Sequence, residues 1–367
     1  MNQIIIRTHK CAYEPGEEIF GVVYLNIVNP TAGTGVCVRF EGYEHFIYNS
    51  GMKDDPEYLV KKQYIDCPFD LYKSEDNLGI GSYVFPFRFK LLSDLPGSFN
   101  ASSLGTEKWW KARIQYWISA ELIHASSVKE TQDVIVYQSL PGTVKQSGPT
   151  QNIIETIDIA KLPILYCRKL SVTGRLLDHI HTSGSVAKLR IIITNNTRIN
   201  VKTIYIKLYG YFAFMTKGPR QLEDDPLVKE EDGNVIIEPI GNPQVIWESR
   251  PIEGCGSEIL NTGIDNVHIP LHYSDGRPIP PTVNSKYHIK CSYEIEVTVE
   301  LENLKKATLL IPLHCVRHIE NDSWSQWQAP QWVYDTEIMT SSSQFSVPEN
   351  VLHGPAFSGI PRFQLLS

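Results

Sequence analysis

Residues 85–99 contain Phe85-Pro-Phe-Arg-Phe-Lys-Leu91 and, after three further residues, Leu95-Pro-Gly-Ser-Phe99. Phe85, Phe87 and Phe89 alternate with Pro86, Arg88 and Lys90, and Leu91 continues the apolar series. A period of two is that of a β-strand with one buried face. Aromatic rings spaced in this way fill the layer between two stacked sheets, and the Pro-Gly-Ser that follows is typical of a turn. The stretch therefore predicts a core strand of a β-sandwich.

The same alternation extends over most of the chain. Short segments rich in β-branched and aromatic residues are separated by Gly, Pro, Asn and Ser, as in strands joined by turns. We predict strands at residues 19–25, 36–40, 84–89, 114–122, 134–136, 189–193, 204–208, 287–299 and 307–313. The sequence has no amphipathic stretch of about 12 residues with a period of 3.6, so an all-β fold of sandwich type is expected.

An internal repeat indicates two similar sandwiches in tandem. Gly16 matches Gly184, and residues 36–43 match residues 204–211, in each case 168 positions further along the chain. Residues 116–122 match residues 293–299, which lie 177 positions further along. The matched segments are two strands that we expect to pair in each half. We predict an N-terminal sandwich at 1–150, an interlobe linker at 151–165, a C-terminal sandwich at 166–318 and a tail at 319–367.

Composition limits the class of protein. The 367 residues include 34 Lys and Arg against 41 Asp and Glu, a net charge of −7, which does not favour nucleic-acid binding. The run Ile4-Ile5-Ile6 is too short for a signal-peptide core, and no stretch approaches the about 18 apolar residues of a membrane span. The seven cysteines are scattered, without a Cys-x-x-Cys pair. We expect a cytosolic protein without a disulfide framework or structural zinc.

The motifs of common active sites are absent from the sequence. It has no phosphate loop, no glycine-rich dinucleotide loop and no Gly-x-Ser-x-Gly elbow. His179-Ile-His181 would place two imidazoles on one strand face, but no carboxylate or cysteine follows at a spacing diagnostic of metal binding. Surface histidines are the favoured interpretation. We therefore expect no enzymatic activity, no metal and no cofactor.

A series of motifs then runs through both halves in a fixed order. The first half has Tyr13-Glu-Pro-Gly-Glu17, Gly21-Val-Val-Tyr-Leu25, Val36-Cys-Val-Arg-Phe-Glu-Gly42 and the two runs quoted above. The second half has Leu170-Ser-Val-Thr-Gly174, Ile191-Ile-Ile-Thr-Asn-Asn-Thr197, Tyr293-Glu-Ile-Glu-Val297 and Leu310-Ile-Pro312. In this order they resemble the N- and C-terminal domains of arrestins over about residues 3–315, and look most like the α-arrestins.

The resemblance implies a function as well as a fold. Arrestin-like proteins are cytosolic adaptors or scaffolds, so we expect this chain to bind cytoplasmic tails or loops of membrane receptors and transporters. It would direct their endocytosis or vesicle-mediated sorting, with recruitment to the plasma membrane or endosomes. The alternative is a structural subunit of a retromer-like coat or sorting complex.

Three groups of residues are candidate contact sites. Arrestins place basic residues for phosphorylated tails on the N-terminal strand, which here implies a phosphate- or cargo-binding role for Arg7 and Lys10, with Lys61 and Lys62 as neighbours after folding. Residues 49–58 correspond by position to the arrestin finger loop. The candidate cargo contacts there are Asp54, Asp55 and Glu57, and a solvated turn is the alternative.

The third candidate group is Lys108-Trp-Trp-Lys111, with Arg113 close behind it in the sequence. Two tryptophans flanked by cations suit peripheral contact with a membrane interface. Adjacent side chains of a strand point to opposite faces, however, so the alternative is that one of Trp109 and Trp110 is core and the other is an exposed cap.

The sequence also departs from some arrestins. Residues 133–137 contain no arginine and residues 300–306 contain no aspartate, so the buried charge latch of visual and β-arrestins is not expected. The Pro-Pro-x-Tyr motif with which α-arrestins recruit ubiquitin ligases is also missing, since Pro280-Pro281 is followed by Thr282 and Val283. Contact with a ubiquitin ligase or with the trafficking machinery would use other surfaces.

Overall fold

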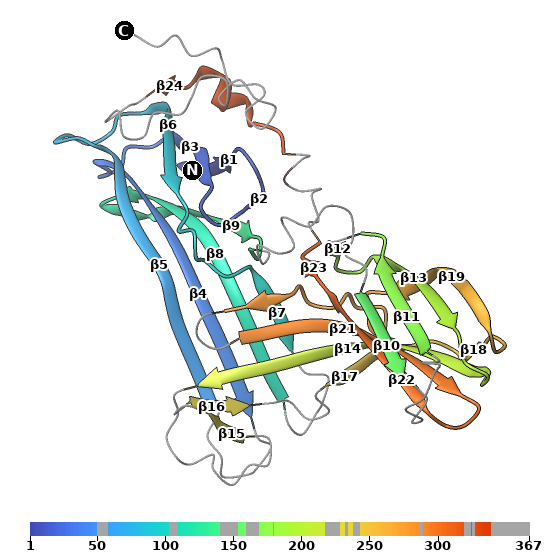
Figure 1. Cartoon of the computed structure of the whole chain (residues 1–367). Helices are drawn as coiled ribbons and strands as arrows, with labels where there is room; N and C mark the ends of the chain where they lie inside the picture. Colours follow the sequence, from blue (N-terminus) through green and yellow to red (C-terminus); the bar gives the residue numbers. More distant parts are fainter. Residues whose placement is uncertain are drawn as a thin grey trace. The chain divides into compact units, whose positions relative to one another are not determined.

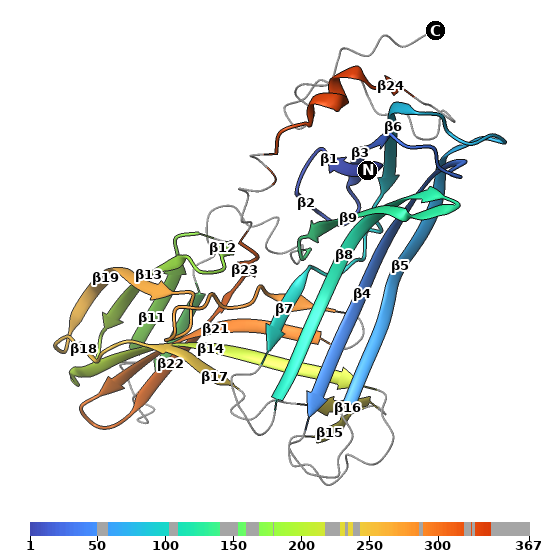
Figure 2. The same cartoon turned by 180° about the vertical axis from the view of Figure 1, so that it is seen from behind.

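A computed structural model describes twelve parts of the chain. They are residues 1–49, 58–102, 109–139, 153–158, 169–178, 180–216, 228–231, 234–237, 243–285, 289–318, 324 and 327–338. These parts form two units (Figures 1 and 2). The N-terminal lobe is Met1–Ser139 together with Ile319–Ser367, and the C-terminal lobe is Leu140–His318.

Two β-sheets form the N-terminal lobe. Its strands are β1 (Gln3–Thr8), β2 (Ala12–Tyr13), β3 (Glu18–Ile27), β4 (Gly35–Asn49), β5 (Tyr58–Lys73), β6 (Gly81–Lys90), β7 (Phe99–Ser102), β8 (Trp109–Ile123), β9 (Ala125–Val136) and β24 (Glu337–Ile338). One sheet has the order β1-β3-β6-β24, and the other has the order β2-β9-β8-β4-β5 with β7 added to β8. The long strands β4, β5 and β8 run side by side in both views (Figures 1 and 2).

The core of the N-terminal lobe lies between these sheets. Phe85 and Phe87 of β6 are fully buried, as is Phe40 of β4 from the opposite sheet. Phe89 packs on Phe40 with ring centroids 4.6 Å apart, so the alternation predicted from the sequence is observed. The Phe87 ring lies on Gly21 of β3, where a Cβ atom would be only 2.2 Å from the ring. A glycine at this position therefore lets the ring fill the core.

The C-terminal lobe contains three described sheets. Its strands are β10 (Ile153–Asp158), β11 (Lys169–Leu176), β12 (His181–Thr182), β13 (Val186–Asn195), β14 (Val201–Thr216), β15 (Val228–Glu231), β16 (Asn234–Ile237), β17 (Gln244–Glu248), β18 (Ile252–Glu253), β19 (Ile259–Pro270), β20 (Val283–Asn284), β21 (Ile289–Leu301), β22 (Lys306–Leu313) and β23 (Cys315–Val316). One sheet has the order β10-β11-β13-β19, and β12 pairs with β23. The third follows β15-β16-β14-β21-β20, with β17 and β18 on β14 and β22 on β21.

The internal repeat is visible as equivalent strand pairing. In the N-terminal lobe Phe40 of β4 lies opposite Ile118 of β8. In the C-terminal lobe Leu208 of β14 lies opposite Ile295 of β21, and these two residues are 168 and 177 positions after Phe40 and Ile118. The Tyr116 hydroxyl donates to the carbonyl oxygen of Pro96 at 2.8 Å, and the Tyr293 hydroxyl donates to that of Pro280 at 2.7 Å. The two lobes therefore share a registered pair of central strands, and the all-β tandem fold is confirmed.

The structure differs from the sequence prediction at two segments. Residues 153–158, assigned to the linker, form β10 and pair with β11, which gives the edge of β11 a partner. In the segment assigned to the tail, residues 331–335 form the 3-10 helix η2 (Gln331–Asp335), and β24 pairs in parallel with β6. The remaining residues of the predicted linker lie outside the described residues.

Candidate functional site

Arg7 of β1 lies beneath the C-terminal segment, by which we mean Trp324 and residues 327–338. Its guanidinium carbon is 4.0 Å from the centre of the Trp324 ring and 4.8 Å from that of Trp327. Its Nη2 atom donates to the carbonyl oxygen of Trp324 at 2.6 Å. The residue is 6% exposed, and burial lowers the pKa of Arg7 from its usual value. Arg7 thus contacts a segment of its own chain and is buried. The phosphate-binding hypothesis would require it to be exposed to solvent.

The C-terminal segment completes an apolar cluster on the sheet that contains β1, β3 and β6. Val333 is fully buried against Val22, Tyr24 and Val84. Tyr24 stacks on Trp327 with centroids 6.3 Å apart and meets Trp332 edge-on at 6.4 Å. Partly buried Ile5, Trp324, Trp327, Ala329 and Trp332 pack around this cluster. The tryptophans of the predicted tail therefore belong to the N-terminal lobe.

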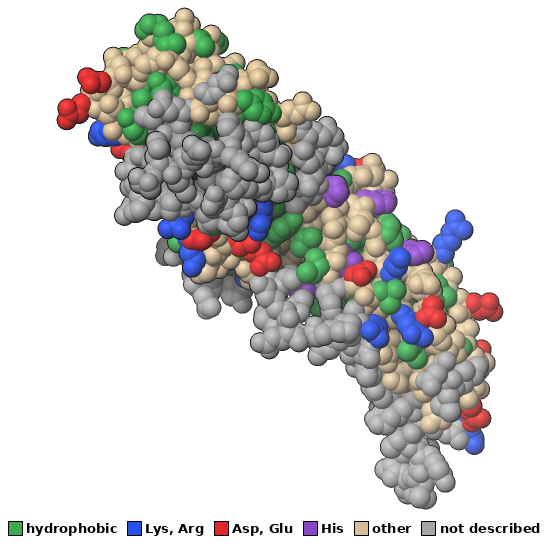
Figure 3. All heavy atoms as spheres, turned by 90° about the horizontal axis from the view of Figure 1, so that it is seen from above, with side chains coloured by type: hydrophobic (Ala, Val, Ile, Leu, Met, Phe, Trp, Pro, Cys, Tyr) green, Lys and Arg blue, Asp and Glu red, His purple; other side chains and the backbone are tan. Residues whose placement is uncertain are grey.

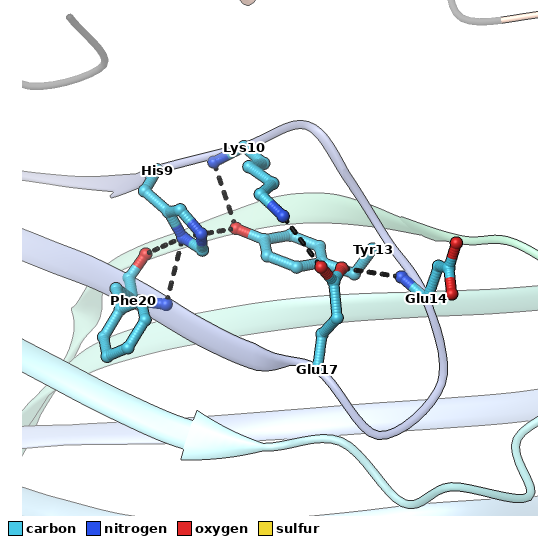
Figure 4. A network of polar contacts seen from close by, with 6 residues as sticks. All are labelled: His9, Lys10, Tyr13, Glu14, Glu17 and Phe20. Carbon is cyan, nitrogen blue, oxygen red and sulfur yellow. Dashed lines mark hydrogen bonds and ion pairs between the residues drawn. The ribbon is translucent and has the colours of Figure 1, made fainter. Parts of the chain in front are cut away.

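Lys10 belongs to a polar network after β1 (Figure 4). Its Nζ atom is 2.8 Å from Oε1 of Glu17, and Oε2 of Glu17 accepts from the Glu14 amide at 2.8 Å. Burial tends to raise the pKa of Glu17, but these hydrogen bonds outweigh it and hold the pKa below its usual value. Because the Lys10 and Glu17 side chains are 48% and 36% exposed, the pair contributes little to stability. Lys10 is accessible, but a carboxylate already compensates its charge.

His9 organises the other half of this network. The Phe20 amide donates to Nδ1 at 3.1 Å, and the Tyr13 hydroxyl lies 3.1 Å from the same nitrogen (Figure 4). Tyr13 in turn accepts from the Lys10 amide at 3.1 Å. Burial lowers the pKa of His9, and the adjacent Lys10 lowers it further. A neutral imidazole fits these contacts, so the network fixes the chain between β1 and β3 and is not a cluster of open cations.

The adjacent Lys61 and Lys62 of β5 lie on different faces of their sheet. Lys61 is opposite His45, whereas Lys62 is opposite Glu44 in the register of β4 and β5. Glu44 is fully buried and accepts a short hydrogen bond from the Tyr64 hydroxyl. Strand alternation therefore turns Lys62 toward the core side, where Glu44 is located, and Lys61 away from it. Both side chains are exposed, but they leave the strand on opposite faces and so do not form one cluster.

Lys61 lies on the outer face of the larger N-terminal sheet, by which we mean the face away from the sandwich core. Its Nζ atom is 4.3 Å from the centre of the Tyr43 ring. Tyr43 stacks on Trp117 at 5.4 Å, and Trp117 Nε1 donates to Oε2 of Glu41 at 2.9 Å. This face carries ordered aromatic and charged side chains instead of a dispersed polar surface.

The Trp-Trp pair at the start of β8 is divided between the two faces. Trp110 is buried, at 8% exposure, and Trp109 is only partly exposed, while Lys111 is exposed. Lys111 lies opposite Ile47 of β4, in the row next to His45 and Lys61. Strand alternation thus places Trp110 in the core and leaves Trp109 partly exposed, and membrane contact by this group stays a prediction. Lys108, and likewise Asp54, Asp55 and Glu57, lie outside the described residues.

The structure thus brings three residues that the sequence had singled out, Lys61, Lys111 and Arg113, onto one face. It also adds residues that sequence reasoning missed. The added residues are Tyr43, His45 and Trp117, which occupy outward-facing positions of β4 and β8. The sequence signal for these residues was that polar and aromatic side chains alternate with buried apolar side chains along each strand. It could have been found once β4 and β8 were recognised as neighbours.

The described residues show no cluster of metal-binding side chains. They contain no group of three or more His, Cys, Asp or Glu side chains placed to hold a metal ion. The described cysteines form no disulfide with one another, and burial raises the pKa of the Cys291 and Cys315 thiols. In the part of the chain that the structure covers, no helix is long and apolar enough to cross a membrane.

Comparison with known proteins covers both lobes. Residues 3–138 match the family described as arrestin (or S-antigen), N-terminal domain, and residues 170–316 match the arrestin C-terminal domain. The chain is also 23% identical over 162 residues to the arrestin domain-containing protein A of Dictyostelium discoideum. That match covers 40% of this chain and 28% of the relative, so the chain spans well under half the length of this relative. The order of the two domains, their registered strand pairs and the family matches together show that this chain belongs to the arrestin family.

Proposed function

We propose that the chain is an adaptor that binds cytoplasmic segments of membrane proteins and directs their endocytosis or vesicle-mediated sorting. The family matches support an arrestin-like adaptor role. The direction of cargo into endocytosis or vesicle-mediated sorting is the further step that we propose. The observation that carries the proposal is the presence of both arrestin domains in order, over residues 3–138 and 170–316. An arrestin domain-containing relative is consistent with this role.

The surface chemistry fits protein binding better than catalysis. Aromatic and cationic side chains of β4, β5 and β8 share one face, and aromatic residues and arginine are enriched in protein interfaces. The proposal places the chain in the cytoplasm, with recruitment to the plasma membrane or endosomes through its cargo. A ubiquitin ligase or the trafficking machinery would then join through surfaces other than a Pro-Pro-x-Tyr motif, which the sequence lacks.

Chemical cross-linking of the full chain in membrane fractions of its native cell tests this function. We expect several membrane proteins to be captured through cytoplasmic segments, at less than one copy per chain, in a set that changes with the state of the cell. Capture of one partner at constant equal stoichiometry, with no membrane cargo, would contradict the adaptor role and favour a retromer-like coat subunit.

A further inference from the structure

The C-terminal sheet that contains β14, β17, β21 and β22 exposes aliphatic side chains beside tyrosines. Strand alternation turns every second residue of β14 and β21 away from the sandwich core. On β14 these outward residues include three partly buried tyrosines, Tyr205, Tyr209 and Tyr211. Val245 of β17, opposite Tyr209, is 48% exposed, and Leu310 of the edge strand β22 is 47% exposed. Tyrosines beside exposed apolar side chains are typical of a protein interface.

Carboxylates lie between these apolar side chains. In the register of the four strands, one outward row consists of Val245, Tyr209, Glu294 and Pro312. The next outward row consists of Glu248, Lys207, Glu296 and Leu310. We call these two rows the C-lobe face. It holds three carboxylates and one cation, so it has a local excess of negative charge.

The charges of Glu294 and Glu296 are not compensated by an ion pair among the described residues. Lys207, opposite Glu296, instead has its Nζ atom 3.1 Å from a carboxylate oxygen on β17. Glu296 accepts from the Thr298 hydroxyl at 3.1 Å, and Glu294 accepts from the Tyr211 hydroxyl. Burial raises the pKa of Tyr211 to about 12, and the hydrogen bond to Glu294 adds to the rise, so this hydroxyl remains a donor at neutral pH. Neutral groups thus orient the two carboxylates and leave their charge available.

We propose that the C-lobe face binds a basic segment of a partner protein, with arginine side chains over Glu294 and Glu296 and an apolar side chain against Leu310. A guanidinium forms paired hydrogen bonds with a carboxylate and stacks on aromatic rings. Tyr209 offers such a ring directly opposite Glu294. The two glutamates are two residues apart on one strand, about 7 Å, which matches alternate side chains of an extended segment. This inference does not depend on the proposed adaptor function.

The charge of the C-lobe face disfavours anionic lipids and nucleic acids as ligands. Both present phosphates, which the carboxylates of Glu248, Glu294 and Glu296 would repel. In the view of Figure 3, acidic and basic side chains are interspersed, and hydrophobic side chains form small separate groups. Two adjacent rows that combine exposed Val245 and Leu310 with an excess of carboxylates therefore favour one kind of partner, a protein segment that is both basic and apolar.

Titration of the full chain with defined peptides tests the proposal. The probe is a peptide of about 12 residues with arginine at alternate positions and a leucine between two of them. It is compared with a citrulline version, which keeps the shape of the side chain without its charge, and with a glutamate version. The test variant is Glu294→Gln/Glu296→Gln. The control is Asp178→Asn/Glu302→Gln, which removes the same charge at exposed positions of the C-terminal lobe outside the C-lobe face.

The arginine peptide should bind the wild-type chain and the control equally, and the test variant about tenfold or more weakly. Binding should weaken with salt. Leu310→Gln should also weaken binding several-fold, because it removes the apolar contact. The charge-reversed variant Glu294→Lys/Glu296→Lys should prefer the glutamate peptide. Hydrogen exchange of β14 and β21 should be the same in all of these variants, which shows that the sheet is intact.

Three outcomes would overturn the proposal. They are equal binding of the citrulline peptide, equal losses in the test variant and the control, and unchanged binding in the test variant. If the test variant alters the hydrogen exchange of the sheet, the citrulline comparison on the wild-type chain and Leu310→Gln still decide, because neither removes a carboxylate. Each of these results leaves the adaptor function to its own test.

Discussion

Replacing Phe87 by alanine is expected to lower the free energy of unfolding of the N-terminal lobe by roughly 3–5 kcal/mol. The Phe87 side chain is fully buried between the two sheets, and its ring lies directly on Gly21 of β3. Loss of the ring removes its burial and leaves a cavity that the two rigid sheets cannot close. Hydrogen exchange of the full chain measures this effect, because peptides of β3 and β6 report the N-terminal lobe separately from the C-terminal lobe.

Two further variants make the Phe87 prediction specific. Lys90→Ala, an exposed change on the same strand, should leave the exchange of β3 and β6 unaltered. Gly21→Ala should destabilise the lobe because its new methyl group meets the Phe87 ring, and Phe87→Leu should relieve part of that cost. Unchanged protection in Phe87→Ala would place this ring on an open surface, contrary to the sandwich described above.

Replacing Val333 by aspartate is expected to release the C-terminal segment from the N-terminal lobe. Val333 is fully buried against Val22, Tyr24 and Val84, and an unpaired carboxylate is not tolerated in such a cluster. The lobe should lose about 2–3 kcal/mol from the burial of this side chain alone. Faster hydrogen exchange at β6 and new proteolytic cleavage within residues 327–338 would report the release.

Tyr334→Asp is the matched control, because Tyr334 is 42% exposed on the same 3-10 helix. Its exchange and cleavage patterns should stay close to those of the wild-type chain. Arg7→Ala should have an intermediate effect, since it removes the cation under Trp324 and Trp327 but leaves the Val333 cluster. Equal resistance to proteolysis in Val333→Asp and Tyr334→Asp would show that the segment is not held in this way.

The central strands could be predicted because their signals are local. Alternating apolar residues gave β3, β4, β6, β8, β13, β14, β21 and β22, and the constant offsets between the halves paired β4 with β8 and β14 with β21. A long strand, β5, was not predicted. It has Lys61, Lys62 and Pro68 in its interior, residues that a strand tolerates at a sheet edge, and β5 is the edge strand of its sheet.

The candidate site could be predicted only in part because its residues meet through pairing. Lys61 and Lys62 are adjacent in sequence, yet the register of β5 on β4 places them on opposite faces. Arg113 and His45 joined Lys61 only when the β4–β8 register was known. The contact of Arg7 with Trp324 spans 317 positions of the chain, and no local pattern predicts such a contact. Sequence reasoning thus found the charges and the tryptophans but not their partners.

Site-specific photo-cross-linking in the native cell tests most directly that this arrestin-family chain is a cargo adaptor. A photoreactive residue replaces Gln63, which is exposed on the outer face opposite Tyr43, and a control replaces Lys188 on the C-terminal lobe. Cross-links from position 63 should map to cytoplasmic segments of membrane proteins, and position 188 should not give the same set. The same proteins recovered equally from both positions, or a single soluble partner at position 63 with no membrane protein, would contradict the claim.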